Sequence, residues 1–182
     1  MHNHKSKIEN PESTFLKNVG KLVTANDGGV QTIEKSSILI KNGKIAAIGE
    51  GDADHVIDCG GKMVTAGFVD SHTHPVFYNK RDEEYATRLA GASYEEIAKK
   101  GGGIVSSVDG VRNASKADLV EKVKSRMDRF ITMGTTTVEA KSGYGLDTAT
   151  ELKSLEVIEE LNQSHPMDLV PTFMGGHAFP KE

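Results

Sequence analysis

Cysteine, tryptophan and long apolar runs are scarce or absent in this sequence, and each absence excludes a class of protein. The 182 residues include one cysteine and no tryptophan. Cys59 has no partner for an internal disulfide and forms no thiolate metal site by itself, which indicates a reducing compartment. No apolar segment approaches the roughly 18 residues of a membrane span, and residues 1–5 lack the apolar region of a secretory signal. The sequence therefore predicts a cytoplasmic protein with no membrane partner.

Charge of one sign is not massed anywhere along the chain. There are 22 Lys and Arg residues against 26 Asp and Glu residues, which gives a net charge of −4. Without a basic patch, nucleic acid and anionic membrane surfaces are not expected partners. A complete eight-stranded α/β barrel takes about 250 residues. The chain is shorter, so its length predicts one domain, or a small domain with part of another.

The first third of the chain has the features of a small β unit. Residues 1–13 are polar and without periodicity, and we expect them to form a disordered terminus. Asn42-Gly43 then separates two strand-like runs, which is typical of a hairpin with a type I′ turn. Further strand-like runs follow, and together they predict a β unit over residues 14–65. Its strands are too few to bury both faces, so the unit needs other strands or another domain to pack against.

From residue 66 onward, predicted strands and helices alternate. Short apolar or β-branched runs predict strands at residues 67–70, 135–139 and 168–174. This order implies parallel strands joined by right-handed crossovers, which is the α/β class.

Three helices are expected between these strands. Ser93 and Glu96 form a capping box at the start of a short one. Ser115 caps a longer one that ends at Gly134. Residues 148–162 form the third, with four leucine or isoleucine side chains predicted to point inward: Leu152, Leu155, Ile158 and Leu161.

Polar residues follow each of the three predicted strands. His72 and His74 end the first strand, and their spacing projects both imidazoles to the same side, where they can bind one metal ion. Tyr144 follows the second strand in a glycine-rich segment, and His177 follows the third. Functional groups collect at the carboxyl ends of parallel strands, so these residues are expected at one rim. Ordinary polar strand ends and glycine-rich turns are the alternative interpretation.

Other candidate residues are weaker by position. Arg81 lies in a charged loop, where its guanidinium could bind a substrate carboxylate in bidentate fashion, or could simply be a solvated surface group. His2 and His4 have the spacing of a ligand pair but lie in the polar terminus. His165 follows the third predicted helix, remote from the carboxyl ends of the strands. We expect no metal ligand among these three histidines.

The sequence resembles the amidohydrolase superfamily. The Asn42-Gly43 hairpin and residues 64–74, Val-Thr-Ala-Gly-Phe-Val-Asp-Ser-His-Thr-His, resemble its start, a composite β domain followed by a metal-binding barrel. Four more specific stretches resemble the imidazolonepropionase family: residues 88–97, 100–104, 136–147 and 175–178. The resemblance runs from residue 15 to residue 182.

The fold implied by this resemblance is an incomplete one. Residues 66–182 are expected to form the first three strands of an amidohydrolase-type (β/α)8 barrel. Residues 14–65, a small β-sandwich-like unit, are expected to be the N-terminal part of the composite β domain.

The resemblance also implies an activity, the hydrolytic ring opening of 4-imidazolone-5-propanoate to N-formimidoyl-L-glutamate in histidine degradation. It assigns His72 and His74 as ligands of one divalent or trivalent metal ion, zinc or iron. It assigns Arg81, Tyr144 and His177 to substrate binding.

The family's remaining metal ligands and its acidic proton-transfer residue lie on later strands, which this sequence does not contain. We therefore expect an N-terminal portion of the enzyme with little or no activity alone. The alternatives are another cyclic amidohydrolase, or a non-catalytic metal-binding half barrel that assembles as a homo-oligomer or with a separate chain.

Overall fold

The computed structural model describes residues 11–99 and 101–179. The chain divides into two compact units, Met1–Gly67 and Phe68–Glu182. Most of the expected disordered terminus lies outside the described residues, but Ser13 already begins the first strand. No helix in the described part of the chain is long and apolar enough to cross a membrane.

The first unit is a five-stranded sheet in the order β3-β2-β1-β4, with β5 also paired to β1. β1 and β2 are antiparallel, whereas β4 and β5 run parallel to β1. The strands are β1 (Ser13–Asn26), β2 (Gly29–Lys41), β3 (Lys44–Ile48), β4 (His55–Asp58) and β5 (Met63–Thr65).

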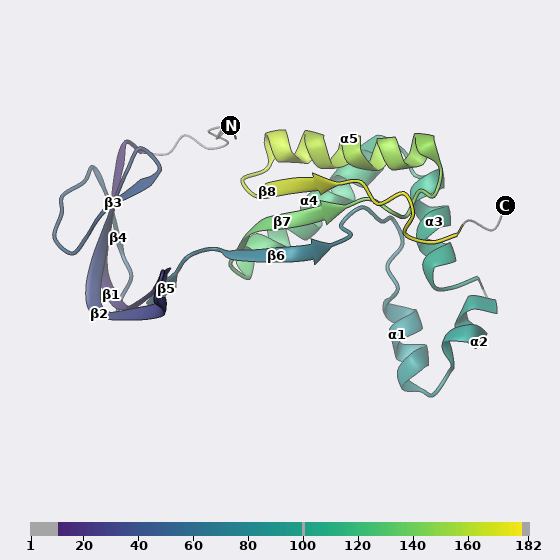
Figure 1. The fold of residues 1–182 in the computed structure, drawn as a ribbon, viewed down its shortest axis with the longest axis horizontal. Helices are drawn as coiled ribbons and strands as arrows, with labels where there is room; N and C mark the ends of the chain where they lie inside the picture. Colours follow the sequence, from purple (N-terminus) through teal and green to yellow (C-terminus); the bar gives the residue numbers. More distant parts are fainter. Residues whose placement is uncertain (1–10, 100, 180–182) are drawn as a thin grey trace. The chain divides into compact units, whose positions relative to one another are not determined.

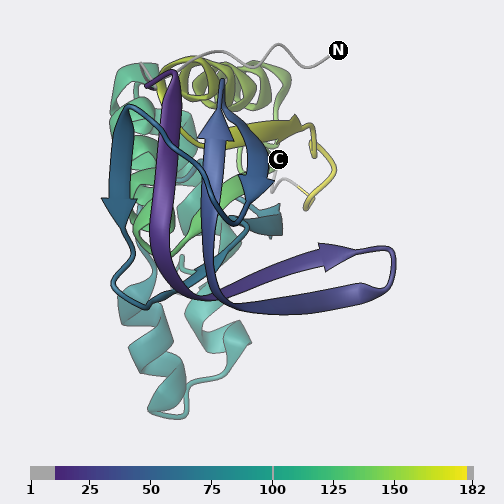
Figure 2. The same ribbon diagram turned by 90° about the vertical axis from the view of Figure 1, so that its left-hand side faces the viewer.

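The expected Asn42-Gly43 hairpin is present between β2 and β3. Asn42 has a φ of 51° and Gly43 a φ of 70°, which are the positive values that a type I′ turn requires. The longer β1–β2 hairpin was not predicted, although Asp27-Gly28 at its turn is also a hairpin signal. Figure 2 shows β1 and β2 bending together, with their connecting turn at the end of a projecting arm.

The core of the first unit is small. Val19, Leu22 and Ile38 are buried together, while apolar side chains such as Ile45 and Met63 are exposed. As the strand count predicted, one sheet of this size does not bury both of its faces.

The second unit contains a three-stranded parallel sheet in the order β6-β7-β8. Figure 1 shows the three strands side by side, with their carboxyl ends at the same edge. The strands are β6 (Phe68–Thr73), β7 (Thr135–Lys141) and β8 (Asp168–Thr172). The parallel arrangement predicted from the alternation of strands and helices is confirmed.

Two long helices pack on this sheet and on each other. Ser115 caps α4 (Lys116–Thr132), and Asp147 caps α5 (Thr148–Ser164). The capping box at the start of α2 (Tyr94–Lys99) is also present, because Ser93 N–H donates to Glu96 at 2.8 Å and Glu96 N–H donates to the Ser93 hydroxyl at 3.2 Å.

The structure confirms most of the expected inward face of α5 and corrects one position. Ile158 and Leu161 are buried, and Leu155 packs against the same core. Leu152, predicted to point inward, is 53% exposed, whereas Glu151 is 2% exposed. The buried side of the helix consists of Thr150, Glu151, Ser154, Val157, Ile158 and Leu161. In the first turn the inward position belongs to Glu151, whose carboxylate accepts three backbone N–H groups. The apolar spacing did not reveal this.

Two helices were not predicted from the sequence. The segment interpreted as a charged loop forms α1 (Asp82–Leu89), which has three acidic residues in its first turn and buries no residue. Acidic side chains stabilise a helix N-terminus, but without a buried stripe the sequence has no helical period to detect. The second is α3 (Ile104–Asn113), which begins directly after Gly103.

Candidate active site at the carboxyl ends of the strands

The carboxyl ends of β6, β7 and β8 bring four of the predicted site residues together. The rings of His74 and His177 are stacked, with centroids 4.3 Å apart and planes 12° apart. The Tyr144 ring lies 5.3 Å from His74 and 5.2 Å from His177. The ring centroids of His72 and His74 are 5.6 Å apart. Residues from three separate strand ends thus form one cluster at the expected rim.

Backbone carbonyl groups fix one nitrogen of two of these histidines. His74 Nδ1 lies 2.8 Å from the Ser142 carbonyl, and His177 Nδ1 lies 2.9 Å from the Gly143 carbonyl. Because a carbonyl oxygen only accepts, each Nδ1 carries the proton and each neutral ring keeps a lone pair on Nε2. Burial, followed by the charge of His177, lowers the pKa of His74, which favours the neutral form.

His72 and His74 fit two positions of a metal site. Neutral imidazole nitrogens bind zinc at about 2.0 to 2.1 Å, and a ligand histidine usually donates its other N–H to a carbonyl or carboxylate. The His74 Nδ1 contact with Ser142 is of this kind. A catalytic zinc takes three protein ligands, yet residues 11–99 and 101–179 contain no group of three or more His, Cys, Asp or Glu side chains that could hold a metal ion.

Arg81 ends the connection that follows β6 and is the N-cap residue of α1. Its Nε donates to Glu84 at 2.7 Å, and its side chain is 37% exposed. Burial raises the pKa of Tyr144, and the positive charge of Arg81 opposes that rise. The charge of the guanidinium therefore acts on Tyr144, although the group forms its ion pair with Glu84 of α1.

A charged pair at the end of β7 borders the cluster. Glu139 accepts hydrogen bonds from Lys141 and, at 2.9 Å, from the Thr172 hydroxyl. The Lys141 contact, followed by that of Thr172, lowers the pKa of Glu139. The Thr73 hydroxyl donates to the Glu139 carbonyl at 2.6 Å, so this residue ties β6, β7 and β8 together beside His72.

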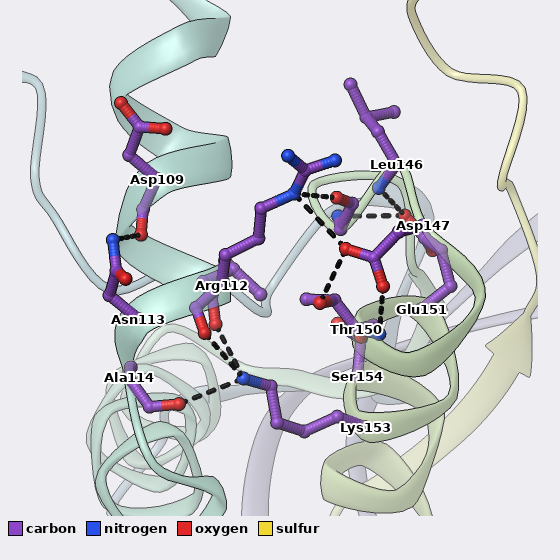
Figure 3. Close-up of polar contacts among 12 residues, drawn as sticks. Asp109, Arg112, Asn113, Ala114, Leu146, Asp147, Thr150, Glu151, Lys153 and Ser154 are labelled. Carbon is purple, nitrogen blue, oxygen red and sulfur yellow. Dashed lines mark hydrogen bonds and ion pairs between the residues drawn. The ribbon is translucent and has the colours of Figure 1, made fainter. Parts of the chain in front are cut away.

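Sequence reasoning missed Glu151 as a site residue. Its buried carboxylate accepts backbone N–H donors from Gly143 at 2.9 Å, Gly145 at 2.8 Å and Leu146 at 2.9 Å. Arg112, from α3, donates from Nε to the Gly145 carbonyl at 2.8 Å. Figure 3 shows that Arg112 and Glu151 both contact the segment that carries Leu146 and Asp147. The sequence did contain a signal, because helical spacing places Glu151 on the same face as Ile158 and Leu161.

Lys153 joins the same helix to the end of α3. Its ammonium group donates to the carbonyls of Val111, Arg112 and Ala114 at 2.8, 3.2 and 2.9 Å. These contacts, drawn in Figure 3, satisfy carbonyls that have no partner within a helix at its C-terminus. The two helices that contact the glycine-rich segment, α3 and α5, are therefore also bonded to each other.

Replacing Asp147 by alanine is expected to lower the free energy of unfolding by about 1 kcal/mol at neutral pH, because an N-cap is lost. The backbone N–H and then the hydroxyl of Thr150 lower the pKa of Asp147 below 3.8. A carboxyl group with a lowered folded-state pKa stabilises the fold above its unfolded-state pKa, and this contribution disappears as the pH falls through the folded-state pKa. The deficit of Asp147→Ala should therefore shrink below about pH 4.

Denaturant unfolding at several pH values measures this effect. Asp147→Asn is the matched control, since asparagine caps equally well without titrating. It should keep most of the stability at neutral pH and lose the pH dependence. A deficit of Asp147→Ala that persists undiminished in acid would contradict the assignment.

The comparisons with known proteins agree with this geometry. No family model matches the chain. Imidazolonepropionases of Bacillus cereus and Bacillus thuringiensis are each 48% identical to it over 93% of the chain and 44% of the relative. The chain therefore spans less than half the length of these relatives.

Solved structures show the same fold in part of their chains. A triazine hydrolase from Arthobacter aurescens matches 89% of this chain with 35% of its own, at a TM-score of 0.55 and 17% identity. An uncharacterized metal-dependent hydrolase from Pyrococcus furiosus matches 88% with 50% of its own, at a TM-score of 0.56 and 15% identity. A guanine deaminase from C. acetobutylicum matches 87% with 35% of its own, at a TM-score of 0.50 and 20% identity. The chain is thus similar, over 93% of its length, to part of the imidazolonepropionases. Its mixed α/β fold is shared with parts of a triazine hydrolase, a metal-dependent hydrolase and a guanine deaminase.

Proposed function

We propose that the chain supplies part of the active site of an imidazolonepropionase, which hydrolyses 4-imidazolone-5-propanoate to N-formimidoyl-L-glutamate. The observation that carries this proposal is the 48% identity over 93% of the chain to relatives of that name. The convergence of two candidate metal ligands with Tyr144 and His177 at one rim supports it.

The proposed architecture extends the three-stranded parallel sheet to a barrel. Residues 66–182 form the first three strands of an amidohydrolase-type (β/α)8 barrel, and residues 14–65 form the N-terminal part of a composite β domain. The parallel order β6-β7-β8 supports this assignment, as does the position of the candidate residues at the carboxyl ends of the strands.

His72 and His74 are the proposed metal ligands. Zinc or iron bound there would supply a hydroxide nucleophile near neutral pH. The His74 ring is held by the Ser142 carbonyl, so its Nε2 is the nitrogen left to coordinate.

Three residues are proposed to bind the substrate. Arg81 binds the propionate carboxylate. Its present ion pair with Glu84 is partly exposed and is worth only about 0.2 to 1 kcal/mol, so the substrate carboxylate can replace Glu84. The Tyr144 hydroxyl donates to a substrate oxygen. His177, with Nδ1 held by Gly143, accepts a ring N–H of the substrate at Nε2.

A second candidate is an assembly role without catalysis. Exposed apolar side chains on and after the sheet strands favour it, namely Val69, Val170 and Phe173. Light scattering on the purified chain separates the two candidates: a defined homo-oligomer supports assembly, and a monomer counts against it.

The isolated chain is expected to show little or no hydrolysis, because two ligands do not make a catalytic metal centre. It should bind Zn²⁺ weakly, and His72→Ala or His74→Ala should remove that binding in calorimetric titrations. His55→Ala, which removes an exposed imidazole on β4, is the matched control. Zn²⁺ binding that survives both substitutions contradicts the ligand assignment.

The substrate is tested in a chimera that replaces the matched 44% of the Bacillus cereus imidazolonepropionase by this chain. We expect it to hydrolyse imidazolonepropionate and to leave guanine and dihydropyrimidines unchanged. A folded, metal-loaded chimera that prefers one of those other rings would overturn the proposed substrate.

A further inference from the structure

The glycine-rich segment of the site, residues 142–146, is held from behind by one buried carboxylate. Glu151 lies in the first turn of α5 and is 2% exposed. Burying a carboxylate is costly unless hydrogen bonds compensate it, and three backbone N–H groups do so here, those of Gly143, Gly145 and Leu146. The segment and the helix start are therefore fixed to each other.

The opposite side of the same segment holds the two stacked histidines. The Ser142 carbonyl accepts from His74 Nδ1 at 2.8 Å, and the Gly143 carbonyl accepts from His177 Nδ1 at 2.9 Å. Gly143 thus donates its N–H to Glu151 and accepts from His177 with its carbonyl. A single residue separates the buried carboxylate from the ring that we propose binds substrate.

Backbone geometry shows how closely the segment is fixed. Leu146 has a φ of 57°, a left-handed conformation that a branched L side chain adopts at a cost of about 1 to 3 kcal/mol. This conformation lets the N–H groups of Gly145 and Leu146 converge on the same carboxylate oxygen. A side chain at Gly145 would lie 2.7 Å from the Glu151 nitrogen, so only glycine permits this approach.

We infer that Glu151 is a positioning residue for the site. By fixing Gly143, it sets the ring orientation and the Nδ1-protonated tautomer of His177, and through Ser142 it does the same for His74. The catalytic consequence rests on the proposed function, but the tautomers are properties of the chain itself and are measurable without metal or substrate.

Glu151→Gln is the test substitution. An amide keeps the size of the side chain but replaces one accepting oxygen by a donor, so it loses either the contact with Gly143 or those with Gly145 and Leu146, and it removes the negative charge. Glu156→Gln is the matched control, because Glu156 lies on the same helix, is exposed and pairs with Lys116. Long-range ¹⁵N–¹H correlation spectra report the tautomer of each histidine, with assignments from His74→Ala and His177→Ala.

The unchanged chain and Glu156→Gln are expected to show His74 and His177 protonated at Nδ1. In Glu151→Gln, both rings should shift toward protonation at Nε2, and the amides of Gly143, Gly145 and Leu146 should exchange about tenfold faster or more. Amide exchange that accelerates while both tautomers stay unchanged overturns the inference.

A second variant keeps the test decisive if Glu151→Gln does not fold. Glu151→Asp preserves the charge but is one methylene shorter, and the same spectra and exchange rates are then read on it. In the chimera, Glu151→Gln should lower kcat/KM and Glu156→Gln should not. An inactive chimera whose histidine tautomers still respond to Glu151→Gln would reject the proposed function while leaving the positioning role intact.

Discussion

Replacing Gly143 by alanine is expected to lower the free energy of unfolding of the second unit by about 2 to 6 kcal/mol. Gly143 has a φ of 121°, and strain at such a position costs about 1 to 3 kcal/mol for an L side chain. A Cβ there would also lie 2.8 Å from the His177 Cβ, and overpacking of this kind costs a further ~1 to 3 kcal/mol.

The same substitution should displace His177 from the Gly143 carbonyl. Denaturant unfolding measures the stability, and the ¹⁵N–¹H spectrum of His177 measures the displacement. Gly176→Ala is the matched control, because a Cβ at Gly176 meets no atom within 4 Å. Equal stabilities of the two variants would show that the close approach of Gly143 to His177 is not maintained in solution.

Replacing Leu161 by alanine is expected to cost about 2 to 5 kcal/mol, the range for truncating a fully buried leucine. Leu161 is 1% exposed, within the core that also contains Ile158 and Met127. Leu152→Ala should change the stability by no more than about 0.5 kcal/mol, since Leu152 is 53% exposed.

This pair of variants tests which side of the first turn of α5 faces the core. The apolar spacing of the sequence placed both leucines inward, whereas the structure places Glu151 inward in the first turn. Urea unfolding followed by the helical circular dichroism signal gives both free energies. If Leu152→Ala lowers the free energy of unfolding as much as Leu161→Ala does, Leu152 faces the core as the sequence predicted. That result would contradict the inward position of Glu151.

Much of the second unit was predictable because its signals are local. A serine followed by an acidic residue marks the starts of α2 and α4, since each satisfies free N–H groups within one turn. β-branched runs mark β7 and β8, and their alternation with amphipathic helices predicts parallel pairing. The rim positions of His72, His74, Tyr144 and His177 followed from that order alone.

The first unit was predictable only in part. Asn42-Gly43 fixes its own turn, since both residues adopt positive φ. The β1–β2 hairpin was not predicted, although Asp27-Gly28 at its turn is a local signal of the same kind.

By itself, the sequence determined where the three parallel strands and the helices α2, α4 and α5 begin and which polar residues reach one rim, because caps, turns and strand ends act over a few residues. Only the tertiary structure decided that Leu152 faces outward and that Glu151 faces inward. The burial of Glu151 depends on hydrogen-bond partners that the folded chain supplies. For Glu151 those partners are three backbone N–H groups of a single glycine-rich segment, and a buried carboxylate is stable only where such donors converge.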